Sequence, residues 1–412
     1  MKYTLAEIAD INKFSISKSD NLQEIIYLDT SSITENLISG TCIIPLPEAP
    51  SRAQRKVKSN TIVYSTVRPR LKHYGILNSP PYNLIVSSGF VTIDLKKEYE
   101  DRIDARYLFL LLTQPAITEY IACIADSAVS AYPSFNPSDI SEIAFSFPNI
   151  EKQKAISEIW SNFEQKISIN RQINDNLEAM AKQLYDYWFV QFDFPNEDGK
   201  PYKSSGGAMV WNEKLKREIP QGWHCGTLLD IAEYTNGLAC QKYRPTDNNI
   251  LPVIKIKEMH DGLSADTELV KADIPDDVKV FDGDVLFSWS ASLEVMLWAY
   301  GNGGLNQHIF KVTSKNGYPR SFYFYQLIHY VGVFKQMAEA RKTTMGHITQ
   351  DHLRQSTIAL PPNVDIANKL EEKLCPIFDE IVKNNQEIMA LTKQRDELLP
   401  LLMNGQASVN SD

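Results

Sequence analysis

The side chains best suited to binding a charged ligand lie between Ser51 and Tyr74, a run with seven basic residues and no acidic one. Lysine neutralises phosphate and arginine can bind guanine through two hydrogen bonds, so this run has the chemistry needed to bind DNA. A solvent-exposed loop without a ligand can have the same composition. The candidate DNA-binding residues of the run are Arg52, Arg55, Lys56, Lys58, Arg68, Arg70, Lys72 and Tyr74.

A second group of candidates lies in the later half of the chain. Asn306 and Gln307 carry carboxamides, which can pair with adenine through two hydrogen bonds. We expect about half of all the candidates to touch DNA and the others to be ordinary surface residues. The remaining members of this group are Gln241, Lys242, Tyr243, Arg244, Lys255, Lys257, Arg341 and Lys342.

Two segments could belong to a methyltransferase, but their surroundings argue against it. Ser79-Pro80-Pro81-Tyr82 is similar to the S-P-P-Y motif with which DNA amino-methyltransferases hold the target amine. The matching cofactor loop would be Gly301-Asn302-Gly303, yet Ala299 stands where that family has an aromatic residue. A predicted strand at Leu305–Val312 also follows, where that family has a helix. We therefore interpret both segments as turns.

Other patterns typical of catalysis or metal binding are absent from the sequence. The chain has no G-x4-G-K-[ST] phosphate loop and no serine nucleophile elbow. His347 and His352 are spaced so that they miss one helical face, and no cysteine cluster joins them. The five cysteines are scattered, which is typical of reduced thiols. The sequence predicts no catalytic residue, no metal and no cofactor.

Composition indicates a globular protein with more than one domain. The 412 residues allow two to three domains of about 150 residues each. Lys and Arg number 42 against 51 Asp and Glu, so the net charge of −9 argues against general binding of nucleic acid. DNA binding would therefore depend on local basic residues. Apolar runs are too short to cross a membrane and no signal sequence precedes them, so we expect a cytoplasmic protein with no membrane partner.

Internal repetition is the strongest feature of the sequence. Each match is weak alone, but the matches occur in the same order in both halves, and small changes in their offset are typical of loop insertions. The sequence therefore predicts a duplication. The matched segments are Leu5–Asp10 with Leu228–Glu233, Asn60–Ser65 with Gly283–Ser288, and Phe135–Pro148 with Ile348–Pro361.

Each copy begins with a mixed segment of about 150 residues. Short β-branched and aromatic runs predict strands, and longer apolar stretches predict helices. The predicted strands are Thr61–Ser65, Leu84–Val86, Phe90–Ile93, Val285–Trp289 and Ile309–Val312, and the predicted helices are Ala105–Leu112 and Ser321–Met337.

A long helix follows each mixed segment, with apolar residues in two rows that step by seven, as in a coiled coil. A stripe of about 33 residues spans about 50 Å, too long for one such domain to cover. The most economical partner is the other copy's helix, although each helix could instead pack on its own domain. Asn170 and Asn385 lie near the middle of the two stripes, and antiparallel helices would place them opposite each other to fix the register. The rows are Ile156, Phe163, Leu177, Leu184; Trp160, Ile167, Ala181, Trp188; Leu370, Ile377, Leu391, Leu398; and Leu374, Ile381, Ile388, Leu402.

With these features the chain resembles a specificity (S) subunit of the type I restriction–modification enzymes. The resemblance covers nearly the whole chain. It rests on Ile219–Trp223 followed by Leu228-x-Asp230-Ile231-Ala232, on the Phe147-Pro148 and Leu360-Pro361 ends, and on Gln153–Leu184, which looks like that family's first conserved helical region.

The resemblance implies an α+β fold with two similar target-recognition domains, separated by two long helices that form an antiparallel coiled coil. It also implies a non-catalytic subunit that reads an asymmetric, two-part DNA site. Its partners would be double-stranded DNA, two methyltransferase (M) subunits and motor-nuclease (R) subunits. The implied parts are domains at 1–149 and 219–362, helices at 150–192 and 363–405, a linker at 193–218 and a tail at 406–412.

Three other interpretations remain open at this point. The chain could be the DNA reader of a related methylation or defence system without the nuclease. It could be a coiled-coil scaffold with two protein-binding domains and no DNA role. A self-sufficient methyltransferase is the third. The basic run favours a DNA reader over the scaffold.

Overall fold

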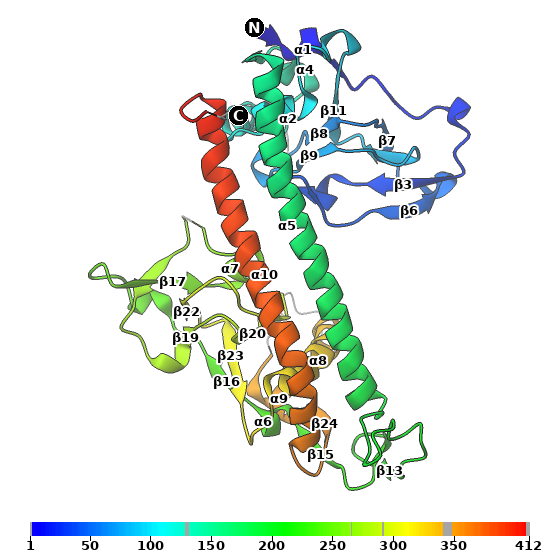
Figure 1. The fold of residues 1–412 in the computed structure, drawn as a ribbon, viewed down its shortest axis with the longest axis vertical. Coiled ribbons are helices and arrows are strands. Elements are labelled where there is room, and N and C mark those ends of the chain that lie inside the picture. The colour runs from blue at the N-terminus through cyan, green and yellow to red at the C-terminus, as the bar shows by residue number, and fades with distance from the viewer. Residues whose placement is uncertain (1, 128–131, 265, 291, 341–347, 409–412) are drawn as a thin grey trace. The chain divides into compact units, whose positions relative to one another are not determined.

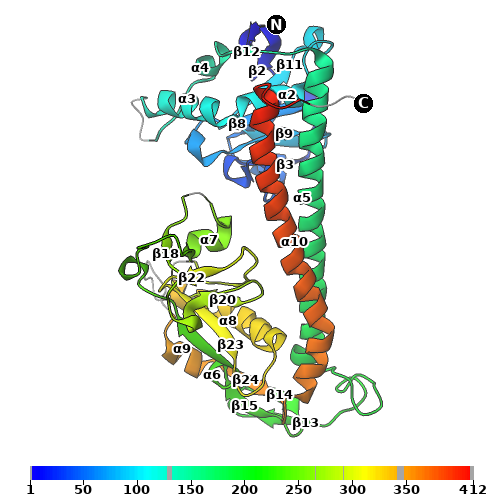
Figure 2. The same cartoon turned by 60° about the vertical axis from the view of Figure 1, so that its left-hand side comes forward.

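A computed structural model describes residues 2–127, 132–264, 266–290, 292–340 and 348–408. The chain divides into two compact units. Unit 1 contains residues 1–164 and 394–412, and unit 2 contains residues 165–393. Both units mix helices and strands, and each contains one segment of each long helix, α5 (Ile150–Tyr185) and α10 (Asp365–Met403). Figures 1 and 2 show the elements of the two units with their labels.

Unit 1 is built on two four-stranded sheets. The first is antiparallel throughout, and the second contains one parallel pair, β3 with β10. The unit is completed by the start of α5, the end of α10 and the shorter helices α1 (Leu5–Ile8), α2 (Ala105–Leu112), α3 (Pro115–Asp126) and α4 (Pro137–Ser141). In sheet order the strands are β2 (Ala9–Ile11), β11 (Phe90–Leu95), β8 (Thr61–Ser65), β9 (Tyr74–Leu77); β6 (Cys42–Pro45), β3 (Glu24–Leu28), β10 (Leu84–Ser87), β7 (Ala53–Lys56); and the pairs β1 (Lys2–Thr4) with β12 (Ala144–Ser146) and β4 (Ile33–Thr34) with β5 (Leu37–Ile38).

Unit 2 also contains two four-stranded sheets, and they have the same strand orders and orientations, including one parallel pair, β17 with β22. Its shorter helices are α6 (Leu228–Ile231), α7 (Ile256–Asp261), α8 (Arg320–Ala340) and α9 (Gln350–Gln355). In sheet order the strands are β16 (Ala232–Asn236), β23 (Ile309–Ser314), β20 (Val285–Ser288), β21 (Glu294–Leu297); β18 (Leu269–Lys271), β17 (Ile250–Ile254), β22 (Gly303–Leu305), β19 (Lys279–Val280); and the pairs β15 (His224–Thr227) with β24 (Thr357–Leu360) and β13 (Met209–Asn212) with β14 (Arg217–Pro220).

Local sequence explains why these elements begin where they do. Thr4 and Thr227 each cap a short helix, and an acidic residue three positions later bonds back to the cap, Glu7 in one case and Asp230 in the other. All five predicted strands are confirmed to within two residues, as is the helix at Ala105–Leu112. The predicted strand at Leu305–Val312 is wrong, because a turn separates β22 from β23 there.

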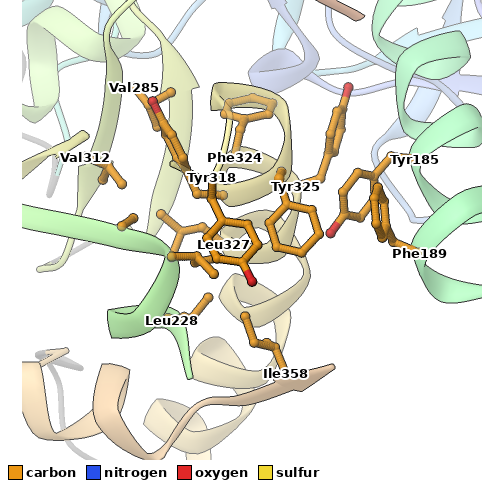
Figure 3. Packing of buried hydrophobic residues seen from close by; sticks show 14 of the residues in the cluster. Tyr185, Phe189, Leu228, Val285, Val312, Tyr318, Phe324, Tyr325, Leu327 and Ile358 are labelled. Carbon is orange, nitrogen blue, oxygen red and sulfur yellow. The ribbon is translucent and has the colours of Figure 1, made fainter. Parts of the chain in front are cut away.

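The core of unit 2 gathers around α8 (Figure 3). Tyr325 on α8 lies 4.9 Å from Tyr185 of α5, measured between ring centroids, and 5.9 Å from Phe378 of α10. Phe322 lies 4.8 Å from Phe189 in an edge-to-face pair. These aromatic contacts fix the unit 2 segments of both long helices on α8.

The long helices also contact each other within each unit. In unit 1, Arg395 donates a hydrogen bond to Glu164 at 2.5 Å, and both side chains are largely buried. In unit 2, Asn174 donates to Asn385 at 2.8 Å and accepts from Asn384 at 2.9 Å. Most residues of the predicted apolar rows are buried or half-buried.

The predicted pairing of Asn170 with Asn385 is wrong by about one helical turn. Asn174 bonds to Asn385 instead, because it continues the row of Ile167 and Ala181 into the helix contact. Asn170 is half-buried, and within the described part of the chain its Nδ2 is buried without a hydrogen-bond partner. The midpoint estimate fails because it is too coarse to separate two asparagines that lie one turn apart on α5.

The segment with linker composition, 193–218, is folded. Its start follows a π-helical turn at Asp186–Val190, and Phe194 stacks on Tyr202 at 4.8 Å and on Trp223 at 5.4 Å. Asp193 accepts two hydrogen bonds from Ser204, and the β13–β14 hairpin follows. Glycine and proline therefore form tight turns around an aromatic cluster here, rather than a free tether.

By length and apolar composition, no single helix among the described residues could span a membrane, whereas the bent pair α2 and α3, with 59° between them, passes that test together.

Candidate nucleic-acid interface

Carboxylates from distant parts of unit 1 contact much of the basic run. The four cations in these ion pairs are exposed or half-buried, and their partners lie up to 56 residues away in the chain. The pairs are Arg52 with Asp29 at 3.5 Å, Lys56 with Asp20, Lys72 with Glu35, and Arg70 with both Glu119 and Asp126 at 2.7 Å.

The cations lower the pKa of two of these carboxylates, Glu119 and Asp20. The hydrogen bond from Arg70 holds the pKa of Glu119 below its usual range, and the one from Lys56 does the same for the pKa of Asp20. Ion pairs at the surface contribute little to stability, because solvent screens them. They do neutralise local charge, so the run is much less positive than its sequence suggests.

Tyr74 belongs to the core of unit 1 and is buried. Its ring lies 5.3 Å from that of Tyr64 and 6.0 Å from that of Phe109, and burial raises its pKa well above the usual value. A residue in this position supports the sheet and cannot contact DNA without unfolding.

Three cations of the run, Arg55, Lys58 and Arg68, make no ion pair within the described residues. Arg68 is exposed and lies over the ring of Tyr132, with 4.8 Å from the guanidinium carbon to the ring centroid. Lys58 is exposed and lies 5.4 Å from the ring centroid of Phe14. Arg55, half-buried, bonds to the Asn12 carbonyl and the Ser15 hydroxyl. Arg68 and Lys58 thus keep their charge available to an anionic ligand.

In unit 2 the candidates also divide into exposed and engaged residues. Lys255 pairs with Glu268 at 2.6 Å, and Lys271 lies over the ring of Tyr243. Asn306 is buried, and its Oδ1 accepts a hydrogen bond from the His308 amide at 3.3 Å. Gln307 is half-buried in the turn between β22 and β23. Four candidates are exposed, namely Gln241, Lys242, Arg244 and Lys257, and two, Arg341 and Lys342, lie outside the described residues.

The segments considered for enzymatic roles do not form a catalytic centre in the described structure. Ser79–Tyr82 connects β9 to β10, and Tyr82 is 85% exposed. Within the described residues, no group of three His, Cys, Asp or Glu side chains could hold a metal ion. A cavity of about 700 Å³ in unit 1 lies beside Trp160 and Leu399, and its cations, Arg70 and Arg395 among them, are held in ion pairs.

Aromatic and imidazole side chains next to the free cations were not found by sequence reasoning. Phe14 and Tyr132 pack under Lys58 and Arg68, and Trp289 lies against His308 with 5.6 Å between ring centroids. The basic residues of the run could not reveal these rings, because the rings come from loops far apart in the chain. An aromatic residue at the end of a predicted strand, such as Trp289 in Val285–Trp289, was the one available signal.

Known proteins resemble this chain over most of its length. A family described as the type I restriction modification DNA specificity domain matches residues 1–179 and 220–393. The specificity subunit of the type I restriction enzyme MjaIX from Methanocaldococcus jannaschii is 26% identical over 84% of this chain and 77% of its own length. The HindI specificity subunit from Haemophilus influenzae is 23% identical over 93% of this chain and 94% of its own.

A solved structure supports the same fold. The crystal structure of a type I restriction-modification system S subunit from M. genitalium aligns with a TM-score of 0.55 at 13% identity, over 98% of this chain and 95% of that one. The family match covers far more than half of the sequence, in two stretches that each contain one pair of four-stranded sheets. The chain therefore belongs to the type I restriction–modification DNA specificity family and is a specificity subunit of that kind.

Proposed function

We propose that this specificity subunit reads an asymmetric, two-part DNA site and directs methylation and cleavage that its partner subunits perform. It is itself non-catalytic, and its partners are double-stranded DNA, two M subunits and R subunits. The observation that carries the proposal is the family match, which falls in two stretches, one in each half of the chain. The exposed Arg68 and Lys58 give the first half cations for phosphate and bases.

Two target-recognition domains, 1–149 and 219–362, follow from a duplication. The repeated segments in the sequence support it, as do the matching strand orders, with β3–β10 and β17–β22 as equivalent parallel pairs. The two domains differ in sequence, so the half-sites they read differ too. We place the conserved helices at 150–192 and 363–405, with a folded connection at 193–218 and a tail at 406–412.

The two long helices act as a spacer in the form of an antiparallel coiled coil. In support, Glu164 bonds to Arg395 and Asn174 bonds to Asn385, so moving forward along one helix corresponds to moving back along the other. A helix of 36 residues is about 54 Å long. Half-sites read on one face of B-DNA are about 34–36 Å apart per helical turn, which such a spacer can match.

A binding titration tests the DNA role. The full chain, purified with M subunits, should retain random duplex at low salt, and the logarithm of its affinity should fall linearly with the logarithm of salt concentration. Absence of binding at low salt would support a protein scaffold instead. Heat released on adding S-adenosylmethionine to the chain alone would indicate a self-sufficient methyltransferase.

Methylome sequencing tests how the site is divided. A host that expresses this chain with its M partner should carry methylation at a two-part motif with a fixed gap. Exchanging residues 1–149 for another domain of the family should change one half-site only. A change in both half-sites would contradict independent reading by two domains.

A further inference from the structure

One structural corner recurs in both units, at the end of the central antiparallel strands. β8 ends at Ser65 and β20 ends at Ser288, and both serines are buried. The Ser65 hydroxyl donates to the Val67 carbonyl at 3.0 Å and accepts from the Val67 amide. The Ser288 hydroxyl donates to a carbonyl four residues later, at Ser292. In each unit the buried serine therefore organises the loop that follows the strand.

The backbone around the two serines is bonded in the same way. In unit 1, the Thr66 amide donates to Gly89 at 2.9 Å, and the Thr66 carbonyl accepts from the Phe135 amide at 3.1 Å. In unit 2, the Trp289 amide donates to His308 at 3.3 Å, and the Trp289 carbonyl accepts from Ile348 at 3.0 Å.

These bonds make Thr66 equivalent to Trp289 and Gly89 equivalent to His308. We call the two sites strand-end corners, and define them by residues 66–68, 88–89 and 132 in unit 1 and by residues 289 and 307–308 in unit 2.

Each strand-end corner presents a polar side chain beside an aromatic ring. In unit 1 the guanidinium of Arg68 lies over Tyr132, and the backbone of Arg68 is left-handed, with φ of 49°. A non-glycine residue in that conformation is uncommon, and such residues cluster at functional sites. In unit 2 the Trp289 ring packs on His308, and Gln307 Nε2 lies 3.4 Å from His308 Nε2.

The neighbouring candidates are engaged elsewhere. Arg70 is only two residues from Arg68, yet its guanidinium is bonded to Glu119 and Asp126. Asn306 is next to Gln307 but is buried. Within the described residues, each strand-end corner therefore keeps one base reader that the sequence predicted, Arg68 in unit 1 and Gln307 in unit 2. The ring beside each side chain limits its conformational freedom, which lowers the entropy lost on binding DNA.

We propose that the two strand-end corners are the base-reading edges of the two domains, an inference that rests on the proposed function. Arg68 reads a guanine in one half-site through its forked donors, and Gln307, beside His308, reads an adenine in the other. The exposed lysines, such as Lys58 and Lys257, would then contact phosphate without reading sequence.

Conservative substitutions separate base reading from charge. Arg68→Lys keeps the positive charge but loses the forked geometry, so affinity for the cognate duplex should fall about 10- to 100-fold while affinity for random duplex and its salt slope stay unchanged. Methylome sequencing should show one half-site relaxed at one position. Gln307→Glu should alter the other half-site only, because a carboxylate accepts from cytosine N4 but has no donor for adenine N7.

Arg106→Lys is the matched control. Arg106 is an exposed arginine on α2 of the same unit, bonded to Ser161 at 3.1 Å, and its substitution should leave both half-sites intact. The inference is overturned if Arg68→Lys weakens binding of cognate and random duplex equally. It is also overturned if Arg68→Lys and Gln307→Glu both keep the wild-type methylation motif. If the wild-type complex binds no duplex at all, the proposed function fails instead, so the two failures are distinguishable.

Discussion

Two asparagines on α5, one turn apart, should respond in opposite ways to the same substitution. Asn170 has a buried Nδ2 without a hydrogen-bond partner in the described structure, and an unsatisfied buried polar group costs about 1–3 kcal/mol. Asn170→Leu removes that cost and extends the apolar row of Phe163 and Leu177. The free energy of unfolding should therefore rise by about 1–3 kcal/mol.

Asn174→Leu should instead destabilise the protein. It leaves the Asn384 amide and the Asn385 carbonyl oxygen unpaired, at a cost of about 1–3 kcal/mol each. Burying leucine returns about 1.5–3 kcal/mol, so the midpoints of these ranges leave a net loss of about 2 kcal/mol. Adding Asn384→Leu removes the unpaired amide of Asn384, so the double variant should recover most of the lost stability.

Thermal unfolding of the full chain measures both effects. For a unit of this size, each kcal/mol shifts the melting temperature by about 2–4 °C. Asn170→Leu should melt above the wild type and Asn174→Leu below it. A lower melting temperature for Asn170→Leu, or a higher one for Asn174→Leu, would refute the assignment of which asparagine is paired across the helix contact.

Two further perturbations probe the cores. Burial raises the pKa of Asp94, although Thr61 donates a hydrogen bond to it at 2.5 Å, so the folded state disfavours its ionised form. The wild type should therefore lose stability as pH rises from the unfolded pKa of about 4 through the raised folded value, whereas Asp94→Asn should not. The urea midpoint of Asp94→Asn minus that of the wild type, measured from pH 4 to 8, should increase with pH. A difference that stays constant over this range would contradict this account. Phe378→Ala removes a ring that lies 5.3 Å from Phe324 and 5.9 Å from Tyr325, so we expect a loss of about 3–5 kcal/mol by urea denaturation. A loss below about 1 kcal/mol would show that this contact does not hold α10 on α8.

Local patterns in the sequence predicted most of the elements. β-branched and aromatic runs such as Thr61–Ser65 are buried on both faces, so their composition alone indicates a strand. The turn at 307–308 was missed because it is short and lies between the buried Asn306 and the buried Ile309. Composition alone could not show that segment 193–218 is folded, because its aromatic cluster includes Trp223, which lies beyond the predicted linker.

The candidate site was less predictable, because charge depends on partners distant in sequence. The sequence shows Arg70 and Arg68 as equals, but only the folded chain brings Glu119 and Asp126 to Arg70. The helix register had a similar limit. A seven-residue row passes through either Asn170 or Asn174, and the contact with Asn385 decides between them.

Unit 1 is discontinuous along the chain, and this has a consequence for its biosynthesis. Leu399 and Leu402 of α10 belong to the same core as Ile156 and Trp160 of α5. A ribosome therefore makes the first part of this core and then the whole of unit 2 before it adds the missing helix. During that interval the core lacks Leu399 and Leu402, and a circular permutation that joins residues 394–412 ahead of residue 1 would remove the delay.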